Sequence, residues 1–290
     1  LDVRGNGGGN IIAGERLLQV LTPNPIEAER FYFLSSRLTL QICEKSSEFA
    51  RWKESIDQSV ETGTEFSNGF TLRPAQRYND IGQKYQGPVV LLTDARCYST
   101  TDIFSAGFQD HQIGKILGTS ARTGAGGANV WTHEFLRTVL SGADSPFQPL
   151  PANASFRVAV RRSTRVGVRS GELVEDLGVT PDDVHRPTRD DVLSNNVDLI
   201  NRAGEMLAEM PAFSVRGQIK RTKSGTQLIL KSANVSRVDL LRDQRTLRTL
   251  DVQDGTTNLE LTDPEKVAGV LELRGFQNGR LVASDRVTLP

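Results

Sequence analysis

A short apolar segment that is followed by a turn and a helix constrains the fold of this chain more than any other feature. Residues 88–93 read Pro-Val-Val-Leu-Leu-Thr, which is typical of a strand buried on both faces of a sheet. After a turn at residues 94–96, apolar residues recur at helical spacing from Ser99 to Gln109. The sequence therefore predicts a buried strand, a sharp turn and a helix that starts at Ser99.

Strand and helix patterns alternate along the rest of the first 210 residues, and the pattern then changes. The spacing of apolar residues predicts strands near 113–118 and 156–162, and helices over 26–60 and 190–210. The remaining 80 or so residues read as short alternating strands separated by Gly, Asn and Asp turns. A chain of 290 residues with 37% hydrophobic content can bury two cores. We therefore expect an α/β domain at residues 1–210 and a small β-sandwich of immunoglobulin-like type at residues 213–290.

Composition excludes several classes of function. Lys plus Arg number 35 and Asp plus Glu number 35, so no net charge attracts nucleic acid or an anionic membrane. No stretch reaches the roughly 20 apolar residues of a spanning helix. Cys43 and Cys97 fit neither a disulfide scaffold nor a zinc site, so we expect no metal or cofactor. The chain opens on Leu1, without Met and within a strand-like run, which indicates a fragment or a processed product.

Ser99 allows two interpretations from its position alone. A side chain between a buried strand and a helix is exposed at the sheet edge, beside the amides of the helix N-terminus, and this placement suits a nucleophile. Serine is also a preferred helix N-cap, and capping is the commoner role.

Four segments, taken in order, favour the nucleophile. Residues 1–9 read Leu-Asp-Val-Arg-Gly-Asn-Gly-Gly-Gly, and residues 97–104 read Cys-Tyr-Ser-Thr-Thr-Asp-Ile-Phe. Residues 117–127 include Thr-Gly-Ala-Gly-Gly, and residues 174–182 read Val-Glu-Asp-Leu-Gly-Val-Thr-Pro-Asp. These segments resemble, in the same order, the strand and glycine loop, the nucleophile segment, the Gly-x-x-Thr-x-Gly segment and the Glu-x-x-Gly-Val-x-Pro-Asp signature of S41 peptidases, the C-terminal processing and tricorn-like proteases.

The resemblance, which spans residues 1–184, implies a ClpP/crotonase-like core. It also implies a serine-type endopeptidase that cleaves a polypeptide substrate through an acyl-enzyme on Ser99. Many relatives are exported, so the resemblance implies a periplasmic or secreted protein. We keep two alternative functions open: a catalytically inactive S41-like peptide-binding protein, and a β domain that carries the function by binding a partner or a cell-wall surface. We also keep open that the protein forms a homo-oligomer.

The sequence differs from the processing-protease branch of the family in its catalytic base. The lysine expected near the Thr-x-Gly loop is absent and Ala125 stands there, so a Ser-Lys dyad is not expected. The tricorn-like branch pairs the serine with a histidine and a downstream glutamate, and Glu175 matches that glutamate. The imidazole would take the serine proton and the carboxylate would fix its tautomer. In that branch the histidine precedes the Asp-x-Arg strand, so we expect it upstream of Leu1, in the N-terminal portion of the protein, or on another chain.

The three histidines of the chain do not match the position of that base. We expect His111 to end the helix that follows Ser99, where its partial charge suits the terminal carbonyl groups. His133 and His185 appear in segments that read as surface connections.

An oxyanion hole needs two converging amides, and Gly8, Gly9 and Thr100 are the candidates. The glycines could instead form only a flexible turn or a phosphate-binding loop, although no Lys or Ser/Thr follows at P-loop spacing. Cys97 is expected in the core, and Asp102 is expected to serve the helix N-terminus.

We expect two further groups of charged residues to have structural roles. Asp2 and Arg4 are expected to pair and fix the first glycine loop. The basic residues between 157 and 165 are expected on a solvated face, with contact to a substrate carboxylate as the alternative. These residues are Arg157, Arg161, Arg162 and Arg165.

Overall fold

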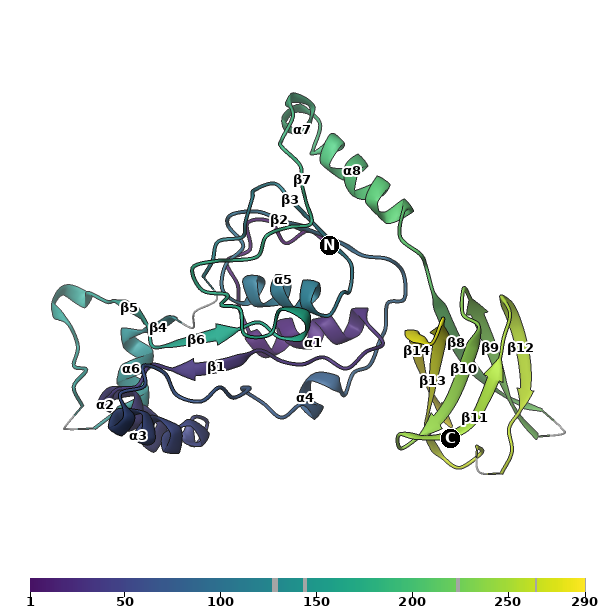
Figure 1. Cartoon of the computed structure of the whole chain (residues 1–290), viewed down its shortest axis with the longest axis horizontal. Helices are drawn as coiled ribbons and strands as arrows, with labels where there is room; N and C mark the ends of the chain where they lie inside the picture. The colour runs from purple at the N-terminus through teal and green to yellow at the C-terminus, as the bar shows by residue number, and fades with distance from the viewer. Residues whose placement is uncertain (127–129, 143–144, 223–224, 264, 290) are drawn as a thin grey trace.

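The computed structural model describes residues 1–126, 130–142, 145–222, 225–263 and 265–289. It contains a central α/β core, an aromatic lobe built from residues 30–72 and 130–164, and a β domain at the C-terminal end (Figure 1). No helix in the described residues is long and apolar enough to cross a membrane.

The core is a parallel sheet covered on both faces. Its strands are β2 (Val90–Thr93), β3 (Lys115–Gly118) and β7 (Asp183–Val184), in the order β2-β3-β7. One face packs on α1 (Ile11–Leu21) and α5 (Thr100–Asp110), and the other on α8 (Val197–Ala208). Alternate residues of β2 face the two layers, which explains why the sequence shows an unbroken apolar run there.

The N-terminal segment joins this sheet beside β2. Asp2 forms a parallel bridge with Leu92, and the Val3 amide donates to Leu92 O over 3.1 Å. The first residues are thus a strand end, as the sequence predicts. The helix α1, which follows the glycine loop and whose N-cap is Asn10, was not predicted.

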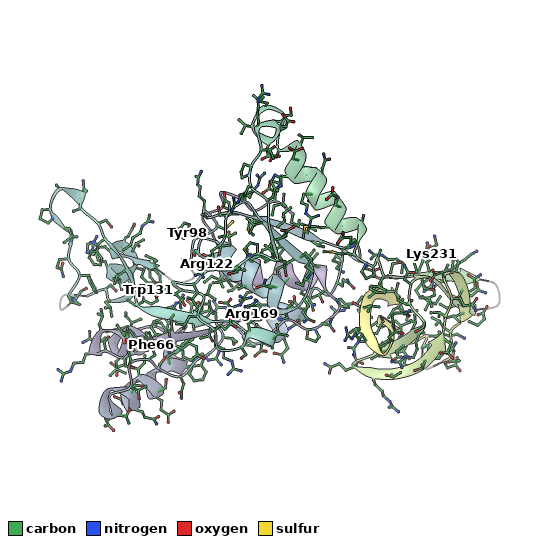
Figure 2. All side chains as sticks on the ribbon, turned by 45° about the horizontal axis from the view of Figure 1, so that its top comes forward. Phe66, Tyr98, Arg122, Trp131, Arg169 and Lys231 are labelled. Atoms are coloured by element: carbon green, nitrogen blue, oxygen red, sulfur yellow. The ribbon has the colours of Figure 1, made fainter. Side chains whose placement is uncertain are left out.

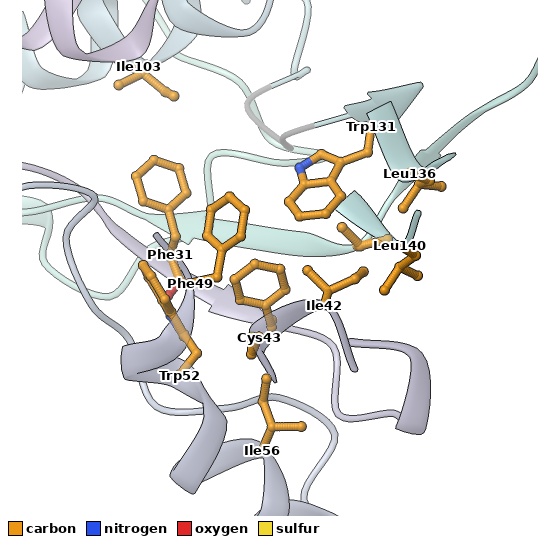
Figure 3. Packing of buried hydrophobic residues seen from close by; sticks show 12 residues of the cluster. Phe31, Ile42, Cys43, Phe49, Trp52, Ile56, Ile103, Trp131, Leu136 and Leu140 are labelled. Atoms are coloured by element: carbon orange, nitrogen blue, oxygen red, sulfur yellow. The ribbon is translucent and has the colours of Figure 1, made fainter. Parts of the chain in front are cut away.

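The aromatic lobe corrects the prediction of helices over residues 26–60. The first part of that range is β1 (Arg30–Phe33), which pairs with β6 (Arg161–Thr164), and α2 (Arg37–Lys45) and α3 (Lys53–Thr62) follow. Phe31 and Phe33 are spaced for a strand, but their partner lies some 130 residues later, so local spacing did not reveal the pairing. Figure 3 shows the aromatic packing of this lobe. The remaining elements of the lobe are β4 (Val130–Thr132), α6 (His133–Val139) and β5 (Arg157–Ala159). The short helix α4 (Gln76–Asn79) lies outside the lobe and contacts α1.

The range 190–210 holds two helices where one was predicted. α7 (Arg189–Leu193) and α8 are separated by Asn195 and Asn196, whose φ angles are 53° and 60°. Asparagine tolerates this left-handed backbone, so the chain changes direction there. α7 lies at the top of Figure 1, and α8 runs back from it and packs on the sheet.

The β domain consists of two antiparallel sheets that share one apolar core, with the orders β11-β10-β13-β14 and β12-β9-β8. Two strands, β11 and β12, were not predicted because few of their residues are apolar. The strands are β8 (Ser214–Thr222), β9 (Gly225–Ala233), β10 (Arg237–Arg242), β11 (Arg245–Asp251), β12 (Gly255–Glu260), β13 (Gly269–Gln277) and β14 (Arg280–Leu289).

Candidate active site

Ser99 has a backbone conformation that serine rarely adopts. Its φ is 57° and its ψ is −122°, in the turn that leads from β2 into α5. Although Ser99 occupies the N-cap of α5, its side chain makes no capping hydrogen bond. Such strain persists only where surrounding structure enforces it, and it is concentrated at functional sites. The Ser99 side chain thus does not act as the helix cap, which was the alternative interpretation of its position.

The surrounding chain holds Ser99 from two sides. The Ser99 amide donates to Gly126 O over 3.0 Å, and the Tyr98 amide donates to Asn6 O over 3.2 Å. Thr100 Oγ1 donates to Gly9 O over 2.7 Å. The turn is thus tied to both glycine loops.

Gly8 is in direct contact with the turn. Its φ is 100°, and a Cβ there would lie 2.7 Å from Ser99 Cβ and 2.9 Å from the Thr100 nitrogen. The Gly8 amide already donates to Asn6 Oδ1 over 2.9 Å. Within the described residues, the amides of Gly9 and Thr100 have no acceptor. Of the three candidates, Gly9 and Thr100 have free donors, and Gly8 provides the close approach.

Asp102 fixes the second glycine loop, a role that the sequence did not reveal. It is fully buried, and its Oδ2 accepts a hydrogen bond from the Gly126 amide over 3.0 Å. Burial raises the pKa of Asp102, while the Thr123 side chain and the amides around it oppose this rise. Tyr98, which is labelled in Figure 2, is exposed, and its ring packs over Gly124 and Gly126. A side chain at either glycine would displace that ring.

Glu175 is buried, in a segment that contacts the second glycine loop. Its Oε1 accepts hydrogen bonds from the Ser163 amide over 2.7 Å and from Ser163 Oγ over 3.3 Å. Its Oε2 is buried and has no partner among the described residues. Burial raises the pKa of Glu175, and hydrogen bonds from its own amide and from Ser163 oppose this effect.

The loop next to Ser99 also contacts the segment that carries Glu175. The Asp176 amide donates to Ala125 O over 3.3 Å, and the Val179 amide donates to Thr123 Oγ1 over 2.7 Å. Among the described side chains, those of Ser99 and Glu175 do not touch, so a further group is needed to link them.

The three histidines are engaged elsewhere. His111 ends α5, where its Nε2 accepts from the Glu27 amide over 2.9 Å and its Nδ1 lies 2.8 Å from Gly107 O. It lies at the other end of α5 from Ser99, about 18 Å away. The ring of His185 contacts Asp191 Oδ2 over 2.6 Å. The expectation for His133 was wrong, because its ring is buried against aromatic neighbours in the lobe.

Arg157 on β5 is exposed, as expected, but the other three basic residues, on β6 and directly after it, are not a solvated face, which corrects that expectation. Arg165 is buried and bonds to Asp110 over 2.6 Å. Arg161 is buried too, which lowers its pKa to about 10, and Arg162 lies 3.8 Å from the centre of the Phe66 ring. Pairing of β6 with β1 brings these residues inside. The rings around Arg161, 5.1 to 5.7 Å from its guanidinium, are those of Phe31, Phe33, Phe49 and Trp131.

The remaining sequence expectations concern single residues near the loops. Cys97 is buried, which raises its pKa to about 12, so it is not a thiolate nucleophile. Arg4 pairs with Asp2 over 2.8 Å and donates to Asn196 Oδ1 over 2.9 Å, which fixes the first loop as expected. In the described part of the chain, no three His, Cys, Asp or Glu residues are placed to hold a metal ion.

Comparison with protein-family models matches residues 1–184 to peptidase family S41. The chain belongs to this family. No curated protein sequence matches the chain. The S41 match ends at the residue that closes β7, so it covers the sheet, both glycine loops, Ser99 and Glu175.

Solved structures resemble this S41 chain at low sequence identity, which shows the fold alone. Mature CPAF is 15% identical with a TM-score of 0.50, over 71% of this chain and 42% of that one. Mature CPAF complexed with lactacystin is 17% identical with a TM-score of 0.48, over 71% and 43%. A putative peptidase from Parabacteroides merdae is 20% identical with a TM-score of 0.44, over 71% and 50%. The match thus spans less than half the length of the CPAF chains.

Proposed function

We propose that the protein is a serine endopeptidase that hydrolyses peptide bonds through an acyl-enzyme on Ser99. The observation that carries this proposal is the strained Ser99 backbone, whose side chain does not cap the helix and which lies between two glycine loops. Ser99 Oγ would attack the scissile carbonyl carbon while the amides of Gly9 and Thr100 donate to the developing oxyanion. The base would take the Ser99 hydroxyl proton and give it to the leaving amine, and water, deprotonated by the same base, would then release the acyl group.

The base in this proposal is a histidine from the N-terminal portion of the protein or from another chain. The histidines of residues 1–290 are engaged away from Ser99, and Ala125 replaces the lysine of the other branch. Glu175 Oε2 is buried and without a partner, so it can accept an N–H from an imidazole placed between Glu175 and Ser99. We also propose that the protein is exported to the periplasm or secreted.

A fluorophosphonate probe tests the proposal, with the complete protein including any residues that precede Leu1. We expect the probe to label Ser99, as located by peptide mapping, and expect no label in Ser99→Ala. Ser105→Ala is the matched control because its hydroxyl is buried in α5 and donates to Thr101 O. A complete protein that folds but remains unlabelled at Ser99 contradicts the proposal and favours a peptide-binding protein without activity.

A further inference from the structure

The N-terminal segment and β2 run side by side until both chains leave the sheet, one toward the first glycine loop and the other toward Ser99. The main-chain hydrogen bonds between them join Leu1 N to Val90 O over 2.9 Å, Leu92 N to Leu1 O over 2.8 Å, and Val3 N to Leu92 O over 3.1 Å. Bonds in a parallel ladder are evenly spaced, so the register predicts the next two. The Asp94 amide would donate to Val3 O, and the Gly5 amide would donate to Asp94 O.

Two side chains take the place of these two main-chain bonds. The Asp94 amide donates to Cys97 Sγ over 3.4 Å, and Cys97 Sγ lies 3.2 Å from Val3 O. The Gly5 amide donates to both carboxylate oxygens of Asp94, over 3.0 Å each. Asp94 O accepts from the Cys97 amide over 3.2 Å, which starts the turn toward Ser99. The two chains thus separate at the sheet edge but stay joined through the Asp94 carboxylate and the Cys97 thiol, which together we call the clasp.

The Asp94 carboxylate also holds the turn itself. Its Oδ1 accepts from the Arg96 amide over 2.9 Å, so one carboxylate binds an amide from each of the two chains. Cys97 Sγ lies 3.4 Å from the same oxygen. The single thiol proton can go to Val3 O or to Asp94 Oδ1, and either bond keeps Cys97 attached to the clasp. Hydrogen bonds to a charged acceptor are roughly twice as strong as neutral ones, so the carboxylate is the stronger member.

The clasp lies where both chains begin their approach to the candidate nucleophile. Ser99 follows Cys97 by two residues. Gly9, whose amide is a proposed oxyanion donor, follows Gly5 by four. Cys97 O also accepts from the Gly124 amide of the second glycine loop over 2.8 Å. Because so few residues separate the clasp from these groups, a shift at the clasp would move the oxyanion donors relative to Ser99 Oγ.

We propose that Asp94 and Cys97 are positioning residues that hold the first glycine loop against the turn before Ser99. In this role they fix the distance between the attacking oxygen and the two oxyanion donors, the amides of Gly9 and Thr100. Neither side chain contacts the substrate, because both act through the loop and the turn. The role rests on the proposed function, in which these amides donate to the developing oxyanion.

Amide hydrogen exchange in the complete protein tests the clasp independently of activity. Asp94→Ala removes the acceptor of two amides, so exchange at Gly5 and Arg96 should become about 10-fold faster or more, as the loss of a hydrogen bond to a charged group predicts. Cys97→Ala removes the sulfur, so exchange at the Asp94 amide should become faster. Unchanged exchange at Gly5 in Asp94→Ala overturns the proposal, whether or not the protein is active.

Steady-state kinetics of the complete protein test the positioning role. Asp94→Ala and Cys97→Ala should lower kcat by about 10- to 100-fold at an unchanged KM, because oxyanion donors act in the transition state and misplaced groups lose their effect there. Cys97→Ser keeps a donor and an acceptor, so it should recover most of the loss. A role in apolar packing alone predicts the reverse order, because serine buries a hydroxyl where alanine buries a methyl group.

Asp57→Ala and Cys43→Ala are the matched controls. Asp57 is exposed on α3, and Cys43 is buried in the aromatic lobe, so neither change should alter kcat or exchange at the clasp. A normal kcat in both Asp94→Ala and Cys97→Ala overturns the positioning role, and so does a Cys97→Ser variant no more active than Cys97→Ala. A complete protein without hydrolysis refutes the proposed function and with it the catalytic role of the clasp, while the exchange measurement still shows whether the clasp itself forms.

Discussion

At the scale of single residues, the site depends on the absence of a side chain as much as on the presence of one. Gly8 lies so close to the Ser99 turn that a methyl group would overlap the Ser99 side chain and the backbone around it. Its φ of 100° is also unfavourable for any other residue. Gly7, one position earlier, has open space around it and no such φ. Substitutions at Gly7 and Gly8 therefore distinguish a steric requirement at Gly8 from a general need for loop flexibility.

We expect Gly8→Ala to lower kcat by about 100-fold or more, because it displaces Ser99 or the Thr100 amide from the reacting geometry. Gly7→Ala should remain within a few-fold of the wild type. Steady-state kinetics with a peptide substrate would measure both. Similar losses in the two variants would show that the loop needs flexibility rather than close approach.

Glu175 is the second residue whose role can be tested in isolation. Glu175→Gln keeps an oxygen that can accept from the Ser163 amide, so folding should change little. If Glu175 orients the base, kcat should fall by about 10⁴, as it does when the carboxylate of a triad is neutralised. Glu172→Gln, at an exposed position, is the control. A nearly normal kcat in Glu175→Gln would show that another group orients the base.

At the scale of elements, α5 is fastened at both ends. Asp102 in its first turn binds the loop at Gly126, and Asp110 in its last turn binds Arg165 of the segment after β6. Both Asp110 and Arg165 are almost fully buried, and burial raises the pKa of Asp110 in spite of the arginine. This pair connects the helix that starts at Ser99 with the strand that holds Ser163.

Asp110→Ala should lower the free energy of unfolding by about 3–5 kcal/mol, because it leaves the Arg165 charge buried without its partner. Glu172→Ala removes the partner of Arg169 at the surface and should cost about 1 kcal/mol or less. Urea denaturation of both variants would measure the difference. Equal effects would mean that water reaches Arg165 in the mutant.

At the scale of the whole molecule, two glutamines join the β domain to the core. Gln86 Nε2 donates to Val215 O on β8 over 2.8 Å and to Ser284 O on β14 over 2.6 Å. Its Oε1 accepts from the Val215 amide, and Gln83 Oε1 accepts from the Ser284 amide. A core segment thus bridges the neighbouring edges of the two sheets, beside the core in Figure 1.

Gln86→Ala should destabilise the docked β domain by about 1–3 kcal/mol, because buried backbone groups lose their partners. Amide exchange in β8 and β14 should become faster, while exchange in β2 should change little. Gln58→Ala on the exposed side of α3 is the control. Unchanged exchange in β8 and β14 would show that apolar contacts alone hold the two parts together.

The sequence by itself determined the local units of the site. The strand β2, the turn and α5 were evident from residues 88–109, because an apolar run and a helical period are properties of neighbouring residues. The two glycine loops and the segment of Glu175 were recognised from their motifs, which are also made of neighbouring residues. The order of these motifs was enough to identify the S41 family.

Only the tertiary structure decided what these units contact. The pairing of β1 with β6 made a strand of residues expected to be helical and moved Arg161 and Arg165 inside. Tertiary packing also brought Arg165 against Asp110 of α5, although the two residues are distant in sequence. Neither could be predicted, because burial and pKa depend on partners from distant segments, whereas periodicity and motifs report only on near neighbours.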